Sequence, residues 1–153
     1  MDLILWRHAE AHEAQPGEDD LARSLTPRGE KEAARMGQWL DRRLPDSARI
    51  LCSPARRCEQ TVLALGRKYK LRDELAPGTT PSQLLEPAEW PRGQRTVVLV
   101  GHQPALGQTL AHLLELPSGQ CAVRKGGLWW LRRREREGQV QVVVMAVMTP
   151  ELA

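Results

Sequence analysis

Three short apolar runs, each followed by polar residues and then by an amphipathic segment, set the hydrophobic pattern of this chain. They cover residues 2–6, 49–52 and 96–100. Each has the length of a β-strand, and the first alternates so little that we expect it to be buried on both faces, as a central parallel strand is. The third is the richest in β-branched residues, which favours a strand. The pattern therefore predicts three strands.

The segments after these runs repeat apolar residues at helical spacing. Thr26 is predicted to cap the first helix and Pro27 to occupy its first position. The buried face of that helix is expected at Ala33, Met36, Gly37, Leu40 and Leu44. The second helix is expected to start at Ser53-Pro54 and to bury Cys58, Val62, Leu65 and Tyr69. The third is expected to bury Leu106, Leu110, Leu113 and Leu114.

Strand–helix units in series imply a parallel sheet covered by helices. We therefore predict an α/β fold, a three-layer α/β/α sandwich with a mostly parallel central sheet. Residues 77–91 are predicted to form a loop, with a short helix where Thr80, Pro81 and Gln83 make a capping-box pattern. Residues 126–148 are predicted to form a C-terminal hairpin that turns near Glu137-Gly138. The 153 residues fit one domain, spanning residues 1–153.

Composition narrows the setting of the protein. No apolar stretch approaches the roughly 20 residues needed to span a bilayer, and Asp2 stands where a signal peptide would be cationic, so we expect a cytoplasmic protein with no membrane partner. Three cysteines, Cys52, Cys58 and Cys121, suit a reducing compartment, and we expect them to be small buried residues. The net charge of +3 favours an anionic ligand.

Polar side chains follow each predicted strand at its carboxyl end, where ligands bind in open α/β sheets. They are Arg7 and His8, then Ser53, Arg56 and Arg57, and then Gly101, His102 and Gln103. Two imidazoles and at least two guanidiniums on one rim describe a site for a tetrahedral oxyanion, with phosphate as the obvious candidate. Singly, each signal has an ordinary alternative, such as a solvated helix face for the two adjacent arginines. His12 and His112 lack a partner motif and are expected on a loop and a helix surface.

Four motifs occur in the order typical of the histidine phosphatase superfamily, which the chain resembles over about two-thirds of its length. They are "RHAE" at residues 7–10, "LTPRG" at 25–29, "SPARRCEQT" at 53–61 and "GHQP" at 101–104. Members commonly have Gly where Ala9 stands, a small departure. The short length and the "GHQP" motif are most similar to SixA-type phosphohistidine phosphatases. The resemblance implies a phosphoglycerate mutase-like fold.

The resemblance also implies site roles. His8 would be the nucleophile of a covalent phosphohistidine intermediate, with Arg7, Arg57 and His102 holding the phosphoryl oxygens. Arg57 fits the arginine position because it stands two residues before Glu59 in the "R-x-E-Q-T" pattern. Further substrate-binding candidates are Arg23, Arg56, Ser53 and Gln103.

The same resemblance indicates the reaction and the partners. It implies hydrolysis of phosphohistidine on a protein, of the histidine-containing phosphotransfer type found in phosphorelay kinases, with no metal and no other cofactor. We expect no nucleic-acid partner, and a monomer or weak dimer.

Two other functions remain open. A small-molecule phosphomonoesterase of the same superfamily would need a carboxylic acid to protonate its leaving group, for which the candidates are Glu74, Glu86 and Glu89. A non-catalytic phosphate- or nucleic-acid-binding module would use "RRRERE" at residues 132–137. A cysteine phosphatase is excluded by spacing, because Arg57 comes one residue too early after Cys52.

Overall fold

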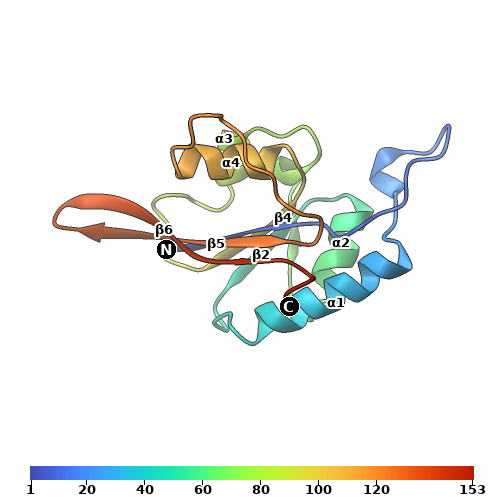
Figure 1. Cartoon of the computed structure of the whole chain (residues 1–153), viewed down its shortest axis with the longest axis horizontal. Coiled ribbons are helices and arrows are strands. Elements are labelled where there is room, and N and C mark those ends of the chain that lie inside the picture. The colour runs from blue at the N-terminus through green and yellow to red at the C-terminus, as the bar shows by residue number, and fades with distance from the viewer.

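The computed structural model describes all 153 residues and places one six-stranded sheet between two layers of helices (Figure 1). The strands lie in the order β3-β2-β4-β1-β5-β6. Their bounds are β1 (Asp2–Arg7), β2 (Arg49–Cys52), β3 (Lys70–Leu71), β4 (Val97–Gly101), β5 (Leu128–Arg136) and β6 (Gln139–Met148). The first four of these form parallel pairs, whereas β5 pairs antiparallel with both β1 and β6. The predicted mostly parallel sheet with a C-terminal hairpin is thereby confirmed.

Helices α1 (Pro27–Asp41) and α2 (Arg56–Leu63) cover one face of the sheet, and α3 (Pro81–Leu85) and α4 (Ala105–Leu113) cover the other (Figure 1). Two 3₁₀ turns, η1 (Asp20–Ala22) and η2 (Asp73–Leu75), lie in the connections. The three-layer prediction is confirmed. No helix combines the length and the apolar character needed to cross a membrane.

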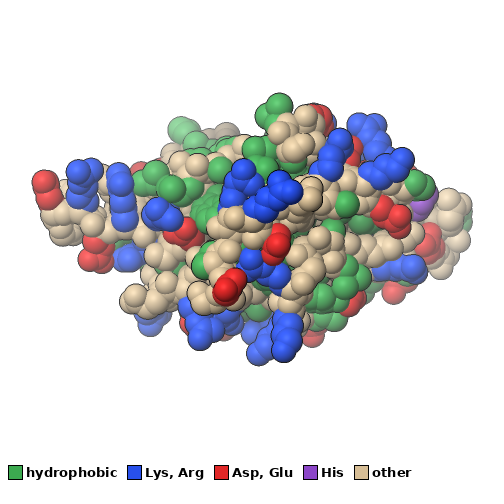
Figure 2. Space-filling model, turned by 90° about the horizontal axis from the view of Figure 1, so that it is seen from below, with side chains coloured by type: hydrophobic (Ala, Val, Ile, Leu, Met, Phe, Trp, Pro, Cys, Tyr) green, Lys and Arg blue, Asp and Glu red, His purple; other side chains and the backbone are tan.

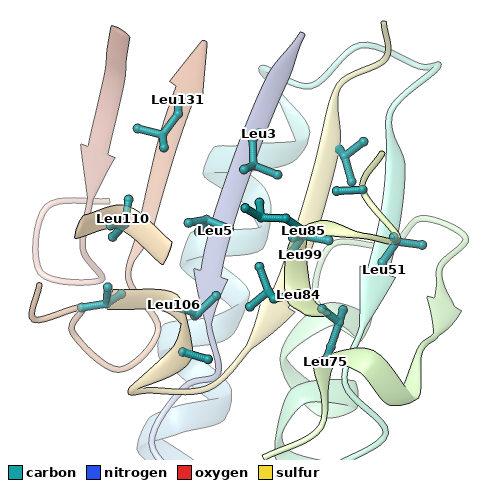
Figure 3. Close-up of a cluster of buried hydrophobic side chains, with 14 residues drawn as sticks. Leu3, Leu5, Leu51, Leu75, Leu84, Leu85, Leu99, Leu106, Leu110 and Leu131 are labelled. Carbon is teal, nitrogen blue, oxygen red and sulfur yellow. The ribbon is translucent and has the colours of Figure 1, made fainter. Parts of the chain in front are cut away.

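Strand β1 divides the core between the two layers. Leu3 and Leu5 point into the 14-residue cluster under α3 and α4 (Figure 3), while Ile4 and Trp6 point into the 13-residue cluster under α1 and α2. All four side chains are fully buried, and burying a leucine or isoleucine contributes roughly 1.5–3 kcal/mol each. The poor alternation of this run thus reflects burial on both faces.

The predicted helix starts were partly right. Thr26 caps α1, because its hydroxyl accepts a hydrogen bond from the Gly29 N–H at 3.0 Å, and the capping box at Thr80 is present. The expected start at Ser53-Pro54 was wrong, since α2 begins at Arg56. The Ser53 hydroxyl accepts from the Ala55 N–H at 3.2 Å, which holds these residues in a turn before the helix. Tyr69 lies beyond the end of α2 rather than on it.

The C-terminal hairpin turns at Glu137 and Gly138, as predicted, with positive φ angles of 54° and 76°. Two positive φ values suit a tight hairpin turn whose twist matches that of its strands. Strand β3 went unpredicted, because two residues are too few to carry a periodic signal. Cys52 and Cys58 are buried as expected, but Cys121 is only half-buried because it lies in the loop after α4.

Gly29 allows the start of α1 to pack against the loop that follows β1. A Cβ atom at this position would lie 2.1 Å from the carbonyl oxygen of Glu10. That carbonyl also accepts the Thr26 N–H at 3.0 Å, and the Thr26 hydroxyl donates to the Glu10 carboxylate at 2.7 Å. The close approach fixes the chain just after His8.

We predict that Gly29→Ala lowers the free energy of unfolding by about 1–3 kcal/mol, because the added methyl group forces this backbone contact apart. In an unobstructed helix the same substitution stabilises by up to about 1 kcal/mol, so the sign is diagnostic. Urea denaturation measures the change. Arg35→Ala, on the exposed side of α1, is the control and should shift stability by less than about 0.5 kcal/mol. A more stable Gly29→Ala protein would contradict the packing described.

Candidate active site

Two histidines meet at the carboxyl edge of the sheet because β1 and β4 are adjacent parallel strands. Arg7 lies opposite Gly101, so His8 and His102 each come directly after the paired residues. The His8 N–H donates to the Gly101 carbonyl at 3.2 Å, and the two ring centroids are 5.3 Å apart. Both residues are buried, with 6% and 5% of their surface exposed.

The hydrogen bonds of His8 determine its tautomer. Its Nδ1 lies 2.7 Å from the carbonyl oxygen of Ala9, which can only accept, so Nδ1 carries the hydrogen and Nε2 carries the lone pair. Burial lowers the pKa of His8 to about 4; the Ala9 bond opposes this shift, and the charges of Arg57 and Arg7 add to it. At neutral pH the ring is therefore an uncharged nucleophile.

His102 is held by Ser53 and Arg57. Its Nδ1 lies 3.4 Å from the Arg57 Nη2, a donor, so Nδ1 is the acceptor, and its Nε2–H donates to the Ser53 hydroxyl at 2.8 Å. Burial, with the neighbouring His8 and Arg57 as further causes, lowers the pKa of His102 to about 3. Ser53 itself is fully buried behind the ring. It positions His102 instead of facing the cavity.

Arg7 and Arg57 each keep one buried donor atom without a partner. Arg7 donates from Nη1 to the Val123 carbonyl at 2.7 Å. Arg57 donates to the Asp20 carbonyl at 2.7 Å and to the Asp20 carboxylate at 3.1 Å. The Nε of both guanidiniums is buried with no hydrogen-bond partner. A buried donor in that state costs about 1–3 kcal/mol.

A cavity of about 280 Å³ joins these groups. Ten residues line it: Arg7, His8, Ala11, Glu13, Arg23, Arg57, Pro77, His102, Gln103 and Lys125. Four are permanently charged cations and one, Glu13, is a carboxylate. The excess of positive charge around two neutral imidazoles favours an anion small enough for the cavity.

Most of the residues expected at the site line this cavity. Gln103 does so with its amide engaged, since it donates to the Cys121 carbonyl at 2.9 Å and accepts from the Gly107 N–H at 2.7 Å. Arg56 is exposed on α2 and is not a lining residue, because adjacent helical positions point in different directions. Arg23 stands at the rim, with its Nε 3.0 Å from the Asp20 carboxylate.

The acids considered from the sequence lie elsewhere. Glu74 accepts from Arg72 at 2.8 Å, and this hydrogen bond lowers the pKa of its carboxyl to about 2. Glu86 and Glu89 line a different cleft. The sequence reasoning missed Glu13 and Asp20, which come from the polar loop after β1. Their signal was the acidic character of that loop close behind "RHAE".

The "RCEQT" segment of α2 also holds the loops around the cavity. The Thr61 hydroxyl accepts from the Ala9 N–H at 3.0 Å, and the Gln60 side chain accepts from the Leu25 N–H at 2.7 Å. Arg57, on the same helix, points between them into the site. His12 and His112 are exposed, as expected. No group of three or more His, Cys, Asp or Glu side chains is arranged to hold a metal ion.

Comparison with known proteins places this geometry in a family. The model of the histidine phosphatase superfamily (branch 1) matches residues 3–78. The phosphohistidine phosphatase SixA homolog of Haemophilus influenzae is 30% identical over 128 residues, covering 74% of this chain and 77% of that protein. Phosphohistidine phosphatase SixA of Escherichia coli is 31% identical over 122 residues, covering 74% of each chain.

A solved structure shows the same fold. The protein histidine phosphatase SixA complexed with tungstate superposes with a TM-score of 0.80 at 23% identity, covering 98% of this chain and 97% of the other. The two histidines at the strand ends, the motifs around them and these relatives agree, and the chain belongs to the histidine phosphatase superfamily.

Proposed function

We propose that this phosphatase removes the phosphoryl group from a phosphohistidine on a protein, of the histidine-containing phosphotransfer type, through a covalent intermediate on His8. The observation that carries the proposal is the neutral His8 ring lining a cavity that the guanidinium-bearing residues Arg7 and Arg57 also line. Tungstate is a tetrahedral oxyanion like phosphate, and the SixA structure of the same fold is a tungstate complex.

The first step transfers the phosphoryl group to the enzyme. The Nε2 lone pair of His8 attacks phosphorus, and the bond from phosphorus to the substrate imidazole breaks. A proton from solvent on the distal nitrogen of that imidazole lets it leave neutral, so no carboxylic acid is required. Arg7 and Arg57 line the cavity and bring two positive charges to the equatorial oxygens, which is where phosphoryl transfer needs stabilisation.

The second step returns the enzyme to its starting state. Water attacks phosphorus, the bond to His8 Nε2 breaks, and the protons of the water pass to phosphate and solvent. The hydrogen that Ala9 holds on Nδ1 makes phosphorylated His8 a cation, so the ring leaves as a neutral imidazole. The same hydrogen bond therefore exposes the lone pair for attack and prepares the ring to depart.

A protein substrate suits the surroundings of the cavity. Leu84 and Leu85 of α3 are buried in the core under α4, and Pro77 is the one residue from this connection that lines the cavity. The connection therefore packs against the body instead of folding over the site as a lid. Lys125 at the rim is exposed and is available to an acidic protein surface.

A phosphomonoester substrate is the second candidate, and Glu13 is the observation that favours it. It is the one carboxylate among the lining residues, so it is the group placed to protonate an alcohol leaving group. Its exposure on the loop after β1 makes it an ordinary surface acid in other respects. A phosphomonoester would need Glu13 as an acid, whereas a phosphohistidine would not.

We predict that the enzyme turns over a phosphorylated phosphotransfer domain with a much higher kcat/KM than small monoesters, and forms an acid-labile, base-stable phosphoenzyme. His8→Ala should abolish both. Arg57→Ala should lower kcat/KM by about 10²–10³ by removing a cation beside the phosphoryl oxygens, and His102→Ala should lower it by about as much by removing the ring that lines the cavity and accepts from Arg57. Labelled phosphate trapping and steady-state kinetics measure the effects. Arg35→Ala on α1 is the control. Turnover that survives His8→Ala would refute the intermediate.

We predict that neither imidazole of the free enzyme takes up a proton until the pH falls below about 5, because burial and the nearby cations disfavour the charged ring. Nitrogen-detected NMR should show His8 as the Nδ1–H tautomer, with signals assigned from His8→Ala and His102→Ala. Tungstate should raise the pKa of His102, since an adjacent dianion favours the protonated ring. A His8 transition near the ordinary value of 6.5 would be incompatible with the site described.

We predict that Glu13→Gln leaves kcat/KM for the phosphorylated domain within about threefold of the parent enzyme but lowers any alkyl phosphate hydrolysis by about 10²–10⁴. The amide keeps the size of the side chain and removes its proton. Glu18→Gln, on the same loop and outside the cavity, is the matched control. An equal loss of kcat/KM with both substrates would show that phosphohistidine cleavage also needs the Glu13 acid, and would contradict the acid-free first step.

A further inference from the structure

Strand β6 forms an outer edge of the sheet, and its segment from Gln139 to Val144 lacks the usual protection of an edge, since the one bulge of the strand lies beyond that segment. Its ten residues, Gln139–Met148, include no charged residue and no proline. Val140 and Val144 are 54% and 41% exposed. Natural edge strands are normally blocked by lysine, proline or short length, because their free N–H and C=O groups pair readily with another strand.

The outer part of the hairpin also extends beyond its own sheet. Strand β1 begins at Asp2, opposite Arg132, and Met1 makes the last contacts from that side, its carbonyl accepting the Arg133 N–H at 2.9 Å. From Arg134 through the turn to Gln141 the hairpin is a two-stranded arm, which projects from the body in Figure 1. Two strands alone are marginally stable in water.

The two faces of the arm differ in chemistry. Val140, Val142 and Val144 lie opposite Glu135, Arg133 and Leu131, so they share the face on the α3 and α4 side. Gln139 and Gln141 lie opposite Arg136 and Arg134 on the other face. Figure 2 shows that second face, with a row of basic side chains along the arm at the left. An anionic partner would be drawn to this row on β5, not to the uncharged edge of β6.

We propose that the β6 edge pairs with β6 of a second copy of this chain, in an antiparallel ladder with the two-fold axis through Val142. In a symmetric antiparallel pair, one residue must lie opposite the same residue of the other copy. Only this arrangement places the corresponding side chains of both copies on the same face of the joined sheet. With Val142 at the axis, Val140 of each copy lies opposite Val144 of the other. Three valines from each copy then form one apolar cluster.

The edge suits a second copy because pairing β6 with itself brings no charges together. The proposed ladder covers Val140–Val144 and so ends before the bulge at Met145, which lies opposite the step from Trp130 to Leu131. So short a ladder buries less than the roughly 800 Å² per partner of a standard interface, so the dimer should depend on concentration. The two cavities lie at the far ends of the bodies and stay open.

Light scattering after size exclusion should give a mass approaching twice the 17.2 kDa chain at high concentration. Val140→Lys should weaken the dimer at least tenfold, and adding Val144→Glu should restore it, because the introduced ammonium group of one copy then faces the introduced carboxylate of the other. Leu63→Lys, at an exposed residue on α2, is the control. Far-ultraviolet circular dichroism checks that each variant folds.

Disulfide trapping tests the register. In a Cys121→Ser background, Val142→Cys should form a covalent dimer on oxidation, because the two thiols lie opposite each other. Val143→Cys should not, since the pairing separates its two copies by more than 7 Å. Cys52 and Cys58 are buried and remain reduced.

A protein that stays monomeric at every concentration would overturn the proposal, as would a dimer that Val140→Lys leaves intact. Binding of the monomer to anionic lipid vesicles without self-association would also overturn it, by assigning the valine face to a membrane surface. Failure of Val144→Glu to restore the Val140→Lys dimer, or equal cross-linking at positions 142 and 143, would reject the proposed register.

Discussion

The parallel pairing of β1 with β4 is the constraint on which the site depends. Arg7 lies opposite Gly101, and the histidine after each residue ends with its ring 5.3 Å from the other. Burial holds this register. The side chains of Ile4 and Trp6 pack in one core cluster, and those of Leu3 and Leu5 pack in the other. A slip of one residue would exchange the two faces of the strand. The hydrophobic core thus sets the distance between the two histidines.

The cavity beside the two histidines has an excess of positively charged side chains. Burial keeps both imidazoles neutral, with pKa values of about 4 for His8 and about 3 for His102, and the nearby positive charges add to this shift. Asp20 compensates part of the charge on Arg57, and although partial burial opposes it, that contact lowers the pKa of the Asp20 carboxyl. The cations that line the cavity attract a dianion, which would also favour proton uptake by His102. Binding and protonation are therefore linked.

The sequence predicted the elements that carry strong periodicity and the rim at which they end. The strands after which Arg7, His8 and His102 follow were placed within one residue, because apolar runs of strand length are a direct consequence of burial. Glu13 and Asp20 could not be placed, since a polar loop has no period and its position depends on contacts with α2. Ser53 was assigned to the ligand, whereas it supports His102, because strand-end residues can point either into or behind a cavity.

Strand β5 runs from the cavity to the hairpin arm, and its two ends lie in different surroundings. Its first residues lie beside the carboxyl end of β1, where the Gly126 N–H donates to the His8 carbonyl at 2.9 Å and the Arg7 N–H donates to the Gly127 carbonyl at 3.0 Å. Its last residues lie beyond Met1, in an arm that makes no pairing with β1. A partner on the arm therefore contacts backbone that β1 does not hold, while the backbone around His8 is fixed by β1 and β4. The assembly proposed at one end of this strand and the phosphoryl transfer proposed at the other therefore share no residue.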